Sequence, residues 1–154
     1  MAKDPFVELA FGDTKLFLQG LAGIDINVTN SDGTNFLQTA LAFKKHEVAC
    51  ILIKKGLDIN HADEDGRTPL HYAATYRAHD VARLILDAGG DLSLTDAQGN
   101  TPLWTAVYEI DHDMVCLFIA HGADPNHTNN YGRSPLDFAR TMNINELVYI
   151  LNNM

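Results

Sequence analysis

Apolar residues recur at helical spacing near the middle of the chain. Val81, Leu84, Ile85 and Leu86 fall on one face of a segment from about residue 80 to 88, which predicts an amphipathic helix. A shorter helix is expected to begin at Pro69, because proline fits the first helical position, and to end by residue 76 or 77. Residues 91–96 then alternate in polarity, which is typical of an extended hairpin arm.

The same arrangement returns every 33 residues. One series of glycines is Gly33, Gly66, Gly99 and Gly132, and a second is Gly23, Gly56, Gly89 and Gly122. Eight of the 11 glycines therefore follow one period. A period of this length indicates stacked copies of one small unit rather than a single globular core. Such a stack offers an extended surface and rarely a catalytic pocket.

The motif at residues 68–74 points to a family. It reads T-P-L-H-Y-A-A and resembles the T-P-L-H-x-A signature of ankyrin repeats, with partial copies at 101–103 and 134–136. The resemblance extends over about residues 5–151. It implies an all-α repeat solenoid, an ankyrin stack of helix-turn-helix units with β-hairpin-like loops.

The resemblance predicts that residues 1–154 form a single ankyrin repeat domain. The expected units are an N-terminal cap at about 5–29, repeats at about 30–62, 63–95 and 96–128, and a C-terminal repeat at 129–154. The family usually has glycine between its two helices, where this chain has Lys44, Arg77, Ile110 and Asn143. We therefore expect the turn between the helices to have a different shape.

Composition and charge narrow the range of partners. The chain is 46% hydrophobic and 20% charged, which suits a folded domain with a sizeable core. Its formal net charge of −9 would be repelled by nucleic acid and anionic lipid, so we expect neither and favour a basic protein partner. No signal peptide or long apolar run is evident, and we expect a cytoplasmic monomer.

Cysteines and histidines give no metal or disulfide site. Cys50 and Cys116 occupy equivalent positions two repeats apart, too far for a disulfide, so both are expected to be free thiols. His46, His79 and His112 also recur at one position and cannot share one ion; each is expected to help start its second helix.

The remaining polar residues suggest local roles. His71 is expected to make local backbone hydrogen bonds, whereas His121 and His127 are either solvated or a loose pair. Asp63, Glu64 and Asp65 are read as a solvated acidic loop tip or a contact for a basic partner. No nucleophile, phosphate-binding or dinucleotide motif occurs, and no cofactor is expected.

The resemblance implies that partners bind the concave face, formed by loop tips and first helices. The expected contact residues are Asp32, Phe43, Glu64, Asp65, Arg67, Tyr76, Asn100, Trp104, Tyr108, Glu109, Tyr131, Arg133 and Met142. Aromatic residues and arginine dominate binding energies at interfaces. Alternatively, Phe43 and Tyr76 only cover the turn between the helices.

The function expected from these features is non-enzymatic protein binding, as a stand-alone inhibitor such as a toxin-neutralising immunity protein. The alternatives are a scaffold or regulatory adaptor, and, with less support, a hydrolase or metalloprotein. In a eukaryotic source, the resemblance would also make Asn27, Asn60 and Asn126 candidate sites of hydroxylation.

Overall fold

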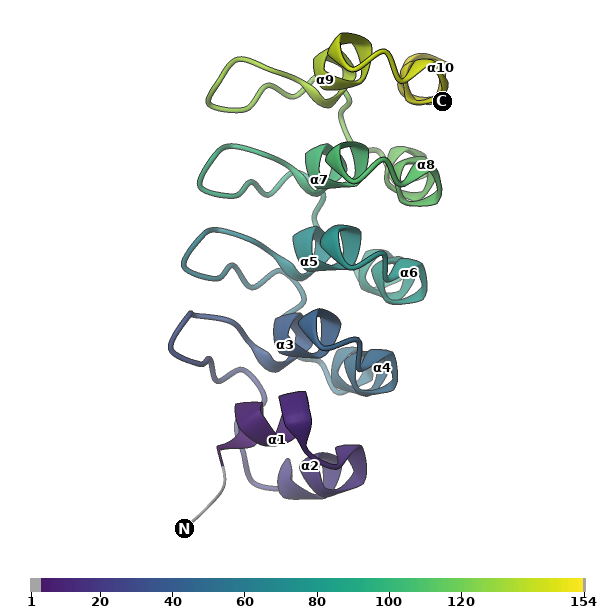
Figure 1. Ribbon diagram of the computed structural model, residues 1–154. Helices are drawn as coiled ribbons and strands as arrows, with labels where there is room; N and C mark the ends of the chain where they lie inside the picture. The colour runs from purple at the N-terminus through teal and green to yellow at the C-terminus, as the bar shows by residue number, and fades with distance from the viewer. Residues whose placement is uncertain (1–3, 154) are drawn as a thin grey trace.

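The computed structural model describes residues 4–153 and consists of stacked layers, each containing one pair of helices (Figure 1). The inner helices form one column: α1 (Pro5–Phe11), α3 (Phe36–Ala42), α5 (Pro69–Thr75), α7 (Pro102–Tyr108) and α9 (Pro135–Thr141). The outer helices form the second: α2 (Thr14–Gly20), α4 (His46–Lys54), α6 (His79–Asp87), α8 (His112–Ala120) and α10 (Asn145–Asn153). The predicted all-α repeat solenoid is confirmed, and one helix pair lies in each expected unit.

Local side-chain chemistry fixes where the inner helices begin. Helices α5, α7 and α9 have proline at their first position, as the motif predicts. The residue before the helix caps its first turn: Asn35 Oδ1 accepts a hydrogen bond from the Gln38 N–H at 3.0 Å, and Ser134 Oγ accepts one from the Asp137 N–H at 3.1 Å. These caps satisfy backbone donors that have no partner within the helix.

The turn between the helices has the left-handed backbone conformation that glycine favours. The prediction that this turn would have a different shape without glycine is therefore wrong. Lys44, Arg77, Ile110 and Asn143 have φ between 52° and 56°. In the first of these turns the Lys45 N–H donates to the Ala40 carbonyl at 2.8 Å and the Lys44 N–H to the Leu41 carbonyl at 3.1 Å. This bonding pattern ends a helix only when one residue is left-handed, so the turn imposes the conformation whatever the side chain.

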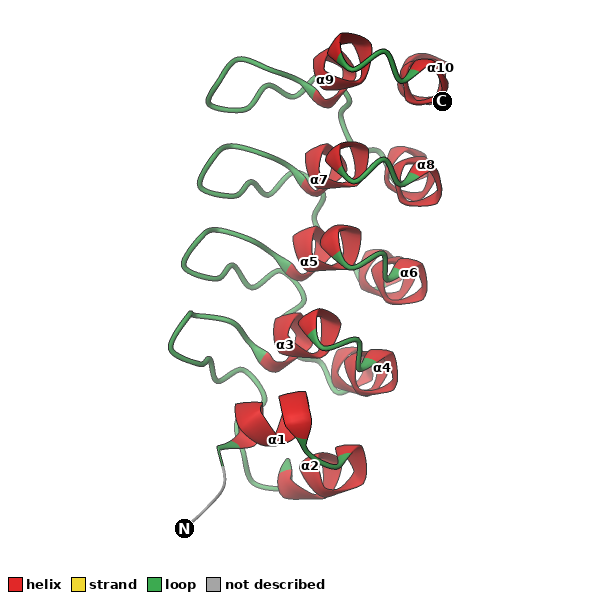
Figure 2. Cartoon of the chain, viewed as in Figure 1, coloured by secondary structure: helices red, strands yellow, loops and turns green. Residues whose placement is uncertain are grey.

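The loops are hairpin-like in outline but contain no strands, which corrects the extended arm expected at 91–96. Figure 2 shows them as irregular segments, and within residues 4–153 the single β-bridge joins Thr29 and Asn35. A side chain shapes each tip instead: Asp63 Oδ1 accepts from the Asp65 N–H at 3.0 Å and the Arg67 N–H at 2.8 Å. The residues at the equivalent positions, Asn30, Asp96 and Asn129, make the same pair of bonds.

The loop tips stack on one another through backbone hydrogen bonds. The Ala97 N–H donates to the Asp65 carbonyl at 2.8 Å, and the Asn130 N–H donates to the Gln98 carbonyl at 2.9 Å. Gly66 has a φ of 75°, and a Cβ there would lie 3.2 Å from backbone atoms of the next tip. Glycine is therefore required both for the turn and for the close approach of its neighbour.

The hydrophobic core is continuous through all the layers. Its largest fully buried side chains include Phe36, Leu70, Ile85, Leu103 and Phe118. Leu84 is partly exposed, unlike the other three residues of the apolar face predicted for this helix. Leu84 therefore lies at the edge of the apolar face, whereas Ile85 is fully buried.

The two cysteines are free, as expected from their spacing, and the structure places both half-buried. Burial raises the pKa of the Cys50 thiol, which keeps it protonated near neutral pH. None of the helices in residues 4–153 combines the length and apolar character that a bilayer-spanning segment requires.

Leu117 and Leu84 give a matched test of the packing. Leu117 is 7% exposed within the core, so Leu117→Ala is expected to lower the free energy of unfolding by about 2–5 kcal/mol. Leu84→Ala removes the same atoms from a partly exposed site and should cost clearly less. Urea denaturation followed by circular dichroism measures both, and equal losses would contradict the assignment of Leu84 to the edge of the core.

Ile110 is a β-branched residue in a left-handed conformation. This conformation costs such a residue roughly 1–2 kcal/mol. Replacement by glycine removes that strain, but the greater conformational freedom of glycine in the unfolded chain offsets part of the gain. Ile110→Gly is therefore expected to raise the free energy of unfolding by about 0.5–1 kcal/mol. Asn143→Gly is the control, since asparagine tolerates the same φ, and its effect should be smaller in the same denaturation assay.

Candidate functional site

The ends of the inner helices bring several predicted contact residues into one column. Phe43, Tyr76 and Met142 each directly follow an inner helix, and Tyr108 is the last residue of α7. Tyr108 is 62% exposed and Met142 55%, whereas Tyr76 is only partly exposed and stacks on Tyr72, with ring centroids 6.3 Å apart. The column is thus an open apolar row beside the loops.

The loop tips add charge to this face. Asp32, Glu64, Asp65, Tyr131 and Arg133 are exposed on them, while Arg67 and Asn100 are partly buried. In residues 4–153 the carboxylates of Glu64 and Asp65 make no hydrogen bond or ion pair. They are therefore available to a partner, in the position where the acidic tip was predicted.

Asp63 has a different role from the two acidic residues that follow it. Besides the two backbone bonds that shape the tip, its Oδ2 accepts a hydrogen bond from the Tyr72 hydroxyl at 2.8 Å. The expectation of a solvated carboxylate is thus wrong for this residue. Burial, with this hydrogen bond, raises the pKa of Tyr72 above its usual range, so the hydroxyl remains a donor.

Arg67 is held in place by its own repeat. Its guanidinium lies 4.8 Å from the centre of the Tyr72 ring and donates to the Thr75 hydroxyl at 2.6 Å. An arginine fixed in this way loses little side-chain freedom when a partner binds it. The place of Arg67 among the contact residues stays a prediction.

In two repeats, a buried polar side chain of the inner helix bonds to the following repeat, and sequence reasoning anticipated only its bonds within its own repeat. His71 accepts from the Thr68 N–H through Nδ1 at 3.1 Å, so Nε2 carries the hydrogen and donates to the Asn100 carbonyl at 3.0 Å. One repeat earlier, Gln38 accepts from the Asn35 N–H at 2.7 Å and donates to the Arg67 carbonyl at 2.7 Å. We call this pair of bonds the inter-repeat bridge.

Trp104 occupies the next position in this series and does not make the bridge. Its ring instead packs on Phe138, with centroids 5.6 Å apart, and Tyr108 packs on the same ring at 5.8 Å. Beside them lies an open groove of about 420 Å³, which we call the Trp104 groove. Its lining includes Arg67, Asp96, Asn100, Trp104, Tyr108 and Glu109.

A second apolar patch lies at the N-terminal end of the same face. The Phe11 and Phe43 rings meet edge to face, with centroids 5.0 Å apart, and Phe11 is 78% exposed. Together with Val7 they line an open groove of about 680 Å³. Phe43 thus packs against the N-terminal unit and remains 42% exposed, a contact that differs from the covering of its own turn considered above.

The recurrent histidines each start an outer helix, as expected, and each also contacts the following repeat. His79 Nε2 lies 2.9 Å from both carboxylate oxygens of the buried Asp111. His46 lies 3.3 Å from Asp80, and the remaining pair, His112 and Glu146, is separated by the same distance. Among the described residues, no three histidine, cysteine or acidic side chains come together as metal ligands would.

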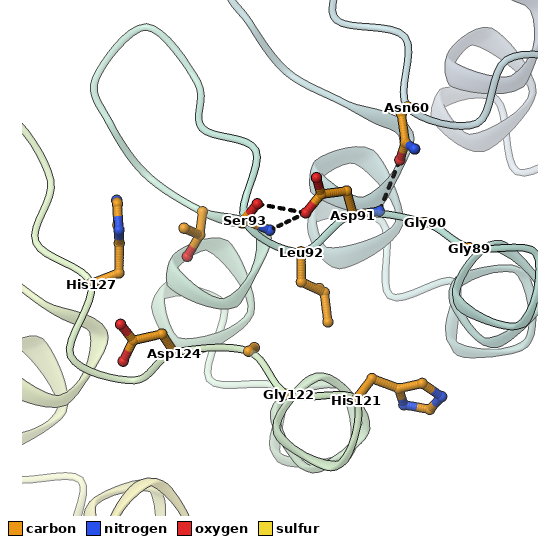
Figure 3. A pocket seen from close by; sticks show the side chains of 12 residues that line it. Asn60, Gly89, Gly90, Asp91, Leu92, Ser93, His121, Gly122, Asp124 and His127 are labelled. Carbon is orange, nitrogen blue, oxygen red and sulfur yellow. Dashed lines mark hydrogen bonds between the residues drawn. The ribbon is translucent and has the colours of Figure 1, made fainter.

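A polar pocket of about 590 Å³ lies where the loops leave the outer helices (Figure 3). The His121 and His127 rings lie apart at its border, bonded to the Leu117 and Gly99 carbonyls at 2.9 and 3.1 Å, so they are not a pair. Asp91 accepts from the Ser93 N–H and hydroxyl, which lowers the pKa of its carboxyl. These polar groups already bond within the protein and present no set directed at a ligand.

Three features of this face were missed by sequence reasoning. Phe138 supports both Trp104 and Tyr108, Phe11 extends the patch at Phe43, and Asn129 shapes the last tip. Phe138 shares its register with Tyr72, so a bulky ring at that position was the available signal. Phe11 lies in the irregular N-terminal unit, where the period gives no register.

Comparison with protein-family models gives two matches. Residues 9–96 match the model described as ankyrin repeats (3 copies), and residues 98–130 match the model described as ankyrin repeat. Comparison with curated protein sequences finds no match.

The buried His71 predicts a specific pH dependence of stability. Burial lowers its pKa below the ordinary 6.5, and the Thr68 N–H directed at Nδ1 leaves no place for a second proton. Below about pH 6.5 the unfolded chain therefore binds the proton more readily, and the free energy of unfolding falls as the pH falls. His71→Gln copies Gln38, keeps both bonds and does not titrate.

We expect wild type to lose stability relative to His71→Gln as the pH falls from 7.5 to 5, with a slope of at most about 1.4 kcal/mol per pH unit. Urea denaturation at a series of pH values measures this difference. The other histidines are common to both proteins and cancel. Parallel curves would show that His71 does not control this dependence.

Proposed function

The chain belongs to the ankyrin repeat family, and from that premise we propose that its concave face binds one basic protein partner. Ankyrin repeats indicate a protein–protein interaction module, and the family is generally non-enzymatic. The observation that carries the proposal is the row of exposed Tyr108, Met142 and Phe43 beside loop tips with unpaired carboxylates. Apolar anchors surrounded by charge are the usual composition of a binding surface.

The charge distribution supports a basic partner. The formal net charge is −9, and the carboxylates of Glu64, Asp65 and Glu109 have no partner among the described side chains. Such a surface accelerates encounter with a positively charged protein and disfavours nucleic acid and anionic membranes. The chain would act as a monomer, leaving its whole concave face to the partner.

We assign to this binding the role of an inhibitor, as in a toxin-neutralising immunity protein. A rigid stack that covers a basic functional surface blocks it without any chemistry of its own. A scaffold or adaptor, the alternative, would hold several unrelated proteins instead of one. Co-expression with the product of a neighbouring gene, scored by the rescue of growth or activity, separates the two roles.

The double substitution Tyr76→Ala and Tyr108→Ala tests the surface. Removing two aromatic anchors from the column is expected to weaken partner binding by at least about 10-fold, since each anchor typically contributes more than 1 kcal/mol. The partner is first isolated by affinity capture on the wild-type chain, and its dissociation constant is then measured by calorimetry.

Tyr149→Ala is the matched control, because Tyr149 is 69% exposed on the outer helix α10. It should bind the partner as wild type does, and all three proteins should keep the same circular dichroism spectrum. Unchanged affinity of the double variant, or equal loss in Tyr149→Ala, would reject the concave face as the binding surface.

A further inference from the structure

We propose that the Trp104 groove receives an arginine side chain of the partner, and that Trp104 is retained there for binding although it weakens the stack. This inference deepens the proposed function and rests on it. It starts from one position of the repeat, where the chain departs from its own pattern.

Trp104 lacks the hydrogen bonds that the equivalent residues make at the bridge position. Gln38 and His71 each accept from a backbone N–H of their own helix start and donate to a carbonyl of the next repeat. An indole nitrogen can only donate, so Trp104 cannot accept the corresponding bond from the Thr101 N–H. Its ring instead packs on Phe138 of the following repeat.

The same departure creates the groove. Trp104 and Tyr108 lie on one face of α7, four residues apart, and both rings rest on Phe138. Phe138 therefore fixes two aromatic surfaces at the border of a space of about 420 Å³. A planar group can stack on such surfaces without ordering flexible side chains first.

The charges around the groove favour a cation. Asp96 and Glu109 line it as carboxylates against the single guanidinium of Arg67. Asp96 bonds to the Gln98 and Asn100 N–H groups, and Arg67 is engaged by Tyr72 and Thr75. The Glu109 carboxylate has no bond to any described residue, so it is free to pair with an incoming charge.

Arginine is the side chain that uses all of these features. Its guanidinium stacks on aromatic rings and donates to a carboxylate at the same time, which a compact ammonium group does less well. A partner carboxylate would instead meet Asp96 and Glu109. A purely apolar side chain would leave Glu109 desolvated without a partner, which is unfavourable.

The first experiment uses Trp104 as its own reporter, since it is the only tryptophan of the chain. Triarginine amide is titrated into the wild-type protein, and the tryptophan fluorescence is expected to change with saturation. Glu109→Gln and Tyr108→Ala should each raise the dissociation constant at least about 5-fold. The neutral isostere tricitrulline amide should cause no saturable change.

Glu47→Gln is the matched control, because Glu47 is an exposed acid on the outer helix α4 and carries the same formal charge. It should bind triarginine as wild type does. The absence of a saturable change in wild type, or an equal loss in Glu47→Gln and Glu109→Gln, would overturn the inference, since binding would then reflect net charge alone.

The second experiment is Trp104→His, which restores the residue found at position 71. The variant is expected to form the inter-repeat bridge to the Arg133 carbonyl and to raise the midpoint of thermal unfolding by about 2–4 °C. It should bind triarginine at least about 5-fold more weakly, as measured by calorimetry. A variant that is no more stable, or that binds equally well, would contradict the retention of Trp104 for binding.

The two proposals can fail separately. If triarginine does not bind the groove while the captured partner still loses affinity for Tyr76→Ala with Tyr108→Ala, only the arginine site is overturned. If the captured partner is insensitive to that double substitution, the proposed function itself is overturned.

Discussion

The burial of one layer by the next is the constraint on which the whole structure depends. A pair of helices of seven and nine residues is too small to enclose its own apolar side chains. Phe36, Leu70 and Leu103 become fully buried only because another layer covers them. The stability of the chain is therefore shared between neighbouring layers, as in other linear repeat proteins.

Polar bonds set the spacing and register of these layers. The bridges give the buried side chains of Gln38 and His71 hydrogen-bond partners in the following repeat, and the loop tips bond to each other beyond them. An unsatisfied buried polar group would cost roughly 1–3 kcal/mol, so the positions that carry these bonds tolerate few residue types. Residues outside these positions are free of that constraint, and the exposed aromatic side chains at the ends of the inner helices lie among them.

Trp104 connects the scaffold with its surface. It stands at a position reserved in the two preceding repeats for a buried polar side chain, yet its ring is partly exposed beside the Trp104 groove. A structural position used in this way indicates that binding and stability compete there. The competition is local, because each layer contacts only its neighbours.

The sequence by itself determined the period and the helix pairs. These depend on local chemistry: proline and cap residues start the inner helices, and glycine permits the tight turns of the loops. The column at Phe43, Tyr76 and Met142 followed directly from the same register.

Only the tertiary structure decided which of these residues act together. The left-handed turn at Ile110, the partial exposure of Leu84 and the engagement of Asp63 by Tyr72 all depend on packing between elements. The groove at Trp104 arises because Phe138, one repeat away, supports two rings at once. Contacts between repeats join residues about 30 positions apart, and a pattern read along the chain contains no information on how their side chains meet.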